Sequence, residues 1–186
     1  MRSRLRESAG FGIVDIMIYT ALVTLIMLVV VSIFSSLFKA QDTVVSSGSA
    51  AESAQAASRS LESGIRNSTA VSVQTVIGAN QLVLARTAGT GSTAGWVCSA
   101  WYFDATKSEL RSTTSPTAIG APTPSQLTGW QLLSAGVAPS SGSTVFTLTG
   151  NRLVSKFKVK ATSTTWIPIE SSVAVEAGSW LSAPCF

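Results

Sequence analysis

One carboxylate inside a long apolar run is the residue whose chemistry stands out most in this chain. Asp15 is the only acidic residue from Phe11 to Phe38, and the same range contains no Lys or Arg. A charge near the centre of a bilayer costs roughly 2.5–3.5 kcal/mol on insertion scales, so such a residue tends to have a function and a partner. The alternative is that Asp15 lies at the membrane interface and only reaches toward water.

The residue types in the rest of the chain exclude much of enzyme chemistry. The sequence has no histidine, which removes His-based triads, His-ligated metals and imidazole acid–base catalysis. No Ser–Lys dyad, phosphate-binding loop or pair of carboxylates occurs in a motif context. We therefore expect neither enzymatic activity nor a cofactor.

The chain has two cysteines, Cys98 and Cys185. Two thiols alone do not make a zinc site, and in a chain that leaves the cytoplasm such a pair indicates one disulfide. The bridge would close a long loop, for which the chain-entropy model gives roughly 4–5 kcal/mol of stabilisation before strain is subtracted. The alternative is two unrelated buried thiols.

The apolar run is long enough to cross a membrane. A spanning helix needs roughly 20 apolar residues, and Phe11–Phe38 exceeds that length and is apolar on all faces, so a small domain could hardly bury it. It is also too long for the apolar core of an ordinary secretory signal, which has about 7–15 residues. Three basic residues precede the run (Arg2, Arg4 and Arg6), which places the N-terminus in the cytoplasm and the rest outside.

The start of the run resembles the class III signal of type IV pilins and pseudopilins. The residues that carry the resemblance are Gly10-Phe11-Gly12-Ile13-Val14-Asp15, followed by an unbroken apolar stretch. The resemblance implies that a prepilin peptidase cuts after Gly10, removing residues 1–10 as a leader, and N-methylates Phe11. It also implies that Asp15, where the family usually has Glu, meets the N-terminal amine of a neighbouring subunit during assembly. Opposite charges stabilise each other more in an apolar setting than in water.

The resemblance further implies partners and a location. The partners are other pilin or pseudopilin subunits, the prepilin peptidase, an inner-membrane assembly platform, and lipid before assembly. The protein would be a single-pass protein of the cytoplasmic membrane that later enters an extracellular filament. The absence of proline from the apolar run favours a minor subunit, a type thought to form or prime the filament tip. A looser resemblance to the J-type, PilW-like minor pilins involves Trp96–Tyr102 and Ser171–Val175.

A plain signal anchor remains the alternative to a pilin. In that case the protein is a surface protein that binds a ligand or a wall polymer through its C-terminal β domain. It then needs neither cleavage after Gly10 nor the carboxylate of Asp15.

The expected fold is α+β, with one long N-terminal helix packed on an antiparallel sheet of five to seven strands. The membrane segment 11–38 continues as an amphipathic helix over 39–67, although Gly48 and Gly64 weaken this prediction and a disordered linker is the alternative. The spacing places most of its apolar residues along one side of the helix; they are Val44, Val45, Ala51, Ala54, Ala57, Leu61 and Ile65. In the C-terminal domain, 68–186, the residue pattern predicts several strands. They lie at 70–77, 81–86, 96–103, 109–112, 144–149, 152–161 and 165–177. We expect one further helix over 125–135, with Trp130, Leu132 and Leu133 facing the core.

Two sets of charged residues in the C-terminal domain are weaker candidates for binding. The first is a basic stripe on one face of a strand, which consists of Arg152, Lys156, Lys158 and Lys160. Such a stripe would suit DNA or another polyanion. We favour a solvated face whose charge is offset by Glu170 and Glu176 on the next strand. Asp104 and Glu109 flank a turn, but two carboxylates are too few for a usual calcium shell, so we expect no metal site.

Overall fold

The chain folds as a long N-terminal helix followed by antiparallel strands, which confirms the expected α+β class. The computed structural model describes residues 12–88, 95–162, 164–175 and 185. Helix α1 comprises Ile13–Arg66. The chain divides into two compact units, residues 1–44 and 45–186, so α1 contributes a segment to each.

The first sheet of the second unit is a simple antiparallel meander of five strands. Its order is β1-β2-β3-β4-β5, so each strand pairs with its neighbours in sequence. The strands are β1 (Ser68–Thr75), β2 (Gln81–Ala88), β3 (Trp96–Asp104), β4 (Glu109–Ser115) and β5 (Gln131–Ala135). In the register Leu82 lies opposite Tyr102, and Ala100 lies opposite Thr113.

The second sheet is organised around one central strand, β8. Its strands are β6 (Val137–Pro139), β7 (Phe146–Thr149), β8 (Arg152–Lys160) and β9 (Trp166–Ala174). β9 pairs with β8 along its whole length. The opposite edge of β8 is therefore shared, with β7 pairing at its first half and β6 at its second half.

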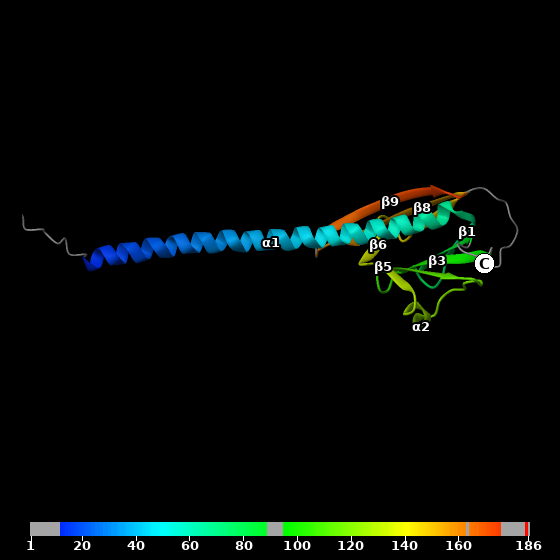
Figure 1. Ribbon diagram of the computed structural model, residues 1–186, viewed down its shortest axis with the longest axis horizontal. Coiled ribbons are helices and arrows are strands. Elements are labelled where there is room, and N and C mark those ends of the chain that lie inside the picture. The colour runs from blue at the N-terminus through cyan, green and yellow to red at the C-terminus, as the bar shows by residue number, and fades with distance from the viewer. Residues whose placement is uncertain (1–11, 89–94, 163, 176–184, 186) are drawn as a thin grey trace, which may run out of the picture. The chain divides into compact units, whose positions relative to one another are not determined.

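The segment of α1 in the second unit packs against both sheets. Figure 1 shows this part of the helix alongside β8 and β9 on one side and β3 and β5 on the other. Its buried residues are Ala50, Ala54, Ala57, Ser58, Leu61 and Ile65. All of these except Ser58 share one apolar cluster with residues of the first sheet, such as Val83 and Phe103, and of the second sheet, such as Phe157. One core therefore joins the helix to both sheets.

A helix glycine makes room for the largest side chain of this core. A Cβ atom at Gly64 would overlap the indole ring of Trp101, whereas a Cβ atom at Gly48 would have nothing within 4 Å. The indole Nε1 of Trp101 also donates to the hydroxyl of Ser60, at 3.3 Å. Gly64 thus lowers helix propensity but permits the close approach of β3 to α1.

A buried amide links the two sheets. The side chain of Gln81 on β2 accepts hydrogen bonds from the backbone N–H groups of Val145 and Phe146 and donates one to the Phe146 carbonyl, at 3.0 Å. Gln81 is only 3% exposed. Its amide therefore satisfies backbone groups at the start of β7 that would otherwise lack partners in the core.

The structure corrects the expected helix over 125–135. The helix α2 comprises only Pro124–Leu127, and residues 131–135 form β5, which pairs with β4. Trp130 and Leu133 are partly buried, but Leu132 is 46% exposed and does not face the core. The reason is tertiary, because pairing with the edge of β4 competes with the helical pattern of this segment.

The expected number of sheets and strands was wrong. The strands form two sheets with nine strands among the described residues, not one sheet of five to seven. The chain changes sheet at Gly136, whose φ of 68° is open to glycine but costly for other residues. On α1, Ala54, Ala57, Leu61 and Ile65 are buried as expected, whereas Val44 and Val45 are exposed.

The two helix glycines provide a matched test of the core. We expect Gly64→Ala to destabilise the protein by about 1–3 kcal/mol, because the added methyl group overlaps Trp101. Gly48→Ala should instead be neutral or stabilising by up to about 1 kcal/mol, because the methyl group meets open space and favours helix. Chemical unfolding of the full chain in detergent micelles measures both. Equal effects of the two substitutions would contradict this packing.

The buried amide is testable in the same way. Gln81→Ala leaves three backbone groups of Val145 and Phe146 unpaired, and each unsatisfied buried group costs roughly 1–3 kcal/mol. We therefore expect a loss of at least about 2 kcal/mol in the free energy of unfolding. Gln74→Ala, at an exposed position of β1, is the control and should change stability by less than about 0.5 kcal/mol.

Candidate functional site

The N-terminal part of α1 exposes an apolar surface that none of the described residues covers. Every residue from Gly12 to Val45 is exposed. Large apolar side chains occur throughout, for example Ile18 at 60% exposure, Leu28 at 67% and Phe38 at 62%. Among the described residues, α1 is the helix long and apolar enough to cross a membrane.

Polar side chains within this segment form hydrogen bonds with their own helix. The hydroxyl of Thr20 donates to the Met17 carbonyl at 3.0 Å, and that of Thr24 donates to the Thr20 carbonyl at 2.7 Å. Ser36 donates in the same way to the Ser32 carbonyl. Each of these three hydroxyl donors is therefore satisfied within the helix, which suits a helix surrounded by lipid or by other helices.

Asp15 lies in the first turn of this helix. Its backbone N–H donates to the Gly12 carbonyl at 3.0 Å, and its side chain is exposed. A carboxylate at a helix N-terminus is favoured by the helix dipole. No basic group among the described residues forms an ion pair with Asp15. The predicted cleavage and methylation site, Gly10 and Phe11, lies outside those residues.

The two cysteines form the predicted disulfide. The Cys98 and Cys185 sulfur atoms are 1.98 Å apart and join positions 87 residues apart in sequence. Both cysteines are buried, and Ile119 packs against them. The bond therefore ties the penultimate residue of the chain to the aromatic strand β3.

The basic stripe lies on β8, and three of its four residues contact side chains of β9. β8 alternates between buried and more exposed positions, and Arg152, Lys156, Lys158 and Lys160 share the outward face. Lys156 forms an ion pair with Glu170 of β9, and Lys158 lies 5.0 Å from the centre of the Trp166 ring. Arg152 donates to the Ser172 hydroxyl. Glu176, the other expected counter-charge, lies outside the described residues.

The two carboxylates near the β3–β4 turn have protein partners. Asp104 accepts hydrogen bonds from the backbone N–H groups of Thr106 and Lys107, at 2.9 and 3.1 Å. Glu109 forms an ion pair with Arg111 at 2.9 Å. In the described part of the chain no group of three or more potential metal ligands occurs.

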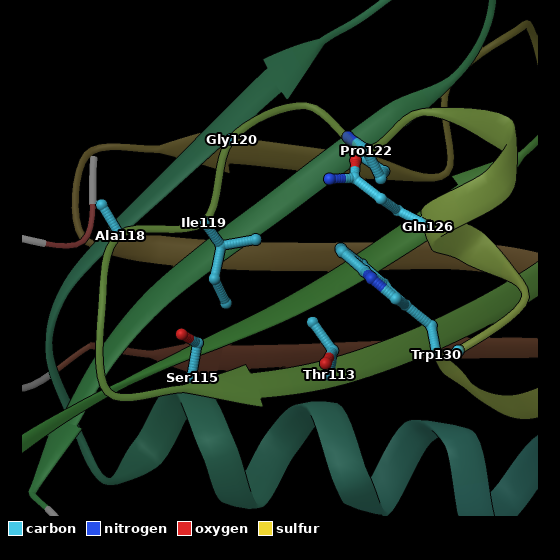
Figure 2. A pocket seen from close by; sticks show the side chains of 9 residues that line it. Thr113, Ser115, Ala118, Ile119, Gly120, Pro122, Gln126 and Trp130 are labelled. Carbon is cyan, nitrogen blue, oxygen red and sulfur yellow. The ribbon is translucent and has the colours of Figure 1, made fainter.

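Sequence reasoning missed a cleft on the outer face of the first sheet. It has a volume of about 470 Å³ and lies between β4, the following loop and α2, as Figure 2 shows. Its lining includes Thr113 and Ser115 of β4, Ile119 of the loop, Gln126 of α2 and Trp130. The sequence does not indicate that these residues line one cleft, because the loop and α2 meet β4 only in the folded chain.

An aromatic pair supports one wall of this cleft. The rings of Trp130 and Tyr102 meet edge to face, with centres 6.2 Å apart and planes at 77°. Burial, and to a smaller extent the charge of Asp104, raises the pKa of Tyr102 above its ordinary value of 10.0. Tyr102 is therefore a neutral partner for Trp130 at physiological pH.

Comparison of the chain with protein-family models, curated proteins and solved structures finds no match. The family resemblance thus rests on the N-terminal residues described above.

Reduction of the disulfide provides a stability test. We expect loss of the Cys98–Cys185 bond, by reduction or by a Cys98→Ser/Cys185→Ser double variant, to lower the free energy of unfolding by about 2–5 kcal/mol. Unfolding curves of the full chain with and without reductant measure this difference. Non-reduced mass spectrometry of the protein extracted from the cell envelope should find no free thiol, and two free thiols would contradict the bond.

Proposed function

We propose that this protein is a minor pilin or pseudopilin, a structural subunit that assembles through its N-terminal helix into a type IV pilus or related pseudopilus. The observation that carries the proposal is an uncovered apolar helix that begins shortly after Gly10-Phe11. Its first turn contains a single carboxylate, Asp15. The protein functions by assembly and has no catalytic turnover.

The uncovered apolar surface of α1 supports a role in which the helix is surrounded first by lipid and later by other subunits. Lipid covers it before assembly, with the N-terminus in the cytoplasm and the C-terminal domain outside. The same surface is covered by the helices of other subunits once the protein is in the filament. In both states its apolar side chains avoid water, so transfer from lipid to filament does not expose them.

The carboxylate supports a specific role in that transfer. Prepilin peptidase cleaves after Gly10 and methylates Phe11, which gives every mature subunit a cationic N-terminal amine in apolar surroundings. Asp15 of one subunit pairs with the amine of its neighbour. An ion pair at about 4 Å has a Coulomb energy of roughly 4 kcal/mol at an effective dielectric constant of about 20. The pair therefore fixes the axial position of one helix against the next.

We expect Asp15→Ala to leave membrane insertion intact and to lower incorporation into filaments by about tenfold or more, because each 1.4 kcal/mol lost corresponds to about a factor of ten. The measurement compares the protein in sheared filaments with the protein in the membrane fraction of the same cells. Asp15→Glu, which restores the residue usual in the family, is the matched control and should assemble.

Mass spectrometry of the mature N-terminus completes this test. The expected first residue is an N-methylated Phe11. Assembled protein that retains Met1, or an Asp15→Ala variant that enters filaments as well as the wild type, would contradict the proposal. Both results would favour the signal-anchored surface protein.

A further inference from the structure

We propose that the cleft between β4, the loop after it and α2 binds a neutral saccharide unit of a glycan chain. The proposal does not depend on filament assembly, since the cleft belongs to the C-terminal domain alone. Its volume of about 470 Å³ is within the range of small-ligand sites, about 300–1,000 Å³.

Trp130 supplies the surface on which a sugar ring can stack. Its side chain is half-buried, and it lines the cleft while its ring meets that of Tyr102 at an interplanar angle of 77°. The face of an aromatic ring carries negative charge density, and the axial C–H groups on one face of a pyranose carry a small positive charge. Stacking of a sugar on Trp130 therefore satisfies both the apolar and the electrostatic character of the ring.

Uncharged hydrogen-bonding groups surround the aromatic ring. The Oε1 atom of Gln126 accepts the Thr123 backbone N–H at 2.9 Å, but its Nε2 amide and the Thr113 hydroxyl form no hydrogen bond with the described residues. Figure 2 shows Thr113 and Ser115 rising from β4 toward Ile119 and Trp130, with Gln126 reaching over the cleft from α2. These groups can donate to and accept from sugar hydroxyls.

The backbone of β4 adds further polar groups. β5 pairs with β4 only from Glu109 to Ser112. Beyond Ser112, no strand among the described residues pairs with this edge of β4. A ligand that extends from the cleft to this edge can therefore bond backbone groups of Thr113–Ser115 as well as the side chains.

The charges around the cleft favour a neutral ligand over an anionic one. No charged side chain lines it. Arg111 precedes Thr113 on the same face of β4, but its Nε donates to Glu109, and its Nη1 donates to the carbonyls of Leu127 and Trp130 at 3.0 and 3.1 Å. The guanidinium therefore positions the end of α2 and Trp130, and its charge is offset by a carboxylate. A phosphate or a nucleic-acid backbone would find no available cation here.

The walls of the cleft are held in place before any ligand arrives. Arg111 fixes the α2 side, as described above. On the loop side, Ile119 packs against the Cys98–Cys185 disulfide. Pre-organised walls lower the entropy cost of binding, which matters for weak ligands such as sugars.

The test uses the full chain in lipid nanodiscs, which avoids sugar-based detergents. Saturation-transfer NMR is measured with cellotriose, maltotriose and chitotriose as neutral probes and with sialyllactose as an anionic comparison. We expect saturable transfer to at least one neutral trisaccharide and weaker transfer to sialyllactose. Empty nanodiscs provide the background.

Three variants locate the site. Trp130→Ala should weaken binding by about tenfold or more, as for aromatic hot spots. Gln126→Glu keeps an oxygen that can accept the Thr123 N–H, but it replaces the amide donor by a charged carboxylate that can only accept. If the amide donates to the sugar, this variant should weaken binding by about three- to tenfold without unfolding. Trp166→Ala, at an exposed tryptophan on the second sheet, should bind as the wild type does.

Thermal unfolding of each variant distinguishes loss of binding from loss of folding. If Trp130→Ala is unfolded, the binding of Gln126→Glu decides whether the proposal holds. The proposal is overturned if no neutral trisaccharide shows saturable transfer, or if sialyllactose binds more tightly than all of them. It is equally overturned if Gln126→Glu binds as the wild type does, or if Trp166→Ala weakens binding as much as Trp130→Ala.

Discussion

The packing of one helix segment against two sheets is the interaction on which the C-terminal domain depends. Small side chains at Ala50, Ala54 and Ala57 let the strands approach the helix, and Leu61 and Ile65 fill the space between the sheets. Neither sheet could bury its inner face without this segment, because the two sheets share their core with it. The Gln81 amide then satisfies the backbone where the sheets meet. The outer face of the first sheet can therefore carry a cleft without weakening the core.

The N-terminal part of the same helix differs from the packed part, because its apolar side chains are exposed and need a cover. From Gly12 to Val45 its side chains are exposed, and no described residue covers them. Apolar surface on this scale is far larger than a soluble monomer tolerates. Lipid and neighbouring helices could both remove such a surface from water, so the proposed assembly and membrane insertion would use the same surface. In that proposal, Asp15 distinguishes a specific neighbour from lipid.

The proposed cleft and the disulfide show how the surface of the domain is organised outside the core. The loop after β4 has few apolar residues, so its position depends on Ile119, the Cys98–Cys185 bond and Trp130. A disulfide restricts the unfolded chain and also holds this loop near β4. The proposed binding and the stability of the outer face thus rest on the same small set of contacts. On β8, in contrast, Lys156 and Lys158 of the basic stripe are paired with Glu170 and Trp166.

The sequence by itself determined the features that depend on local composition or on a unique pairing. The apolar run, the isolated Asp15 and the alternation of β8 are visible because hydrophobicity and its period are local properties, and two cysteines allow one intramolecular bond. Only the tertiary structure decided the rest. Residues 131–135 form a strand because the edge of β4 is available for pairing. The need for glycine at position 64 is explained only by the ring of Trp101. Gln81 is buried only because β7 lies beside β2. Thr113, Gln126 and Trp130 form a cleft for the same reason, since each owes its place to contacts between segments that are separate in sequence.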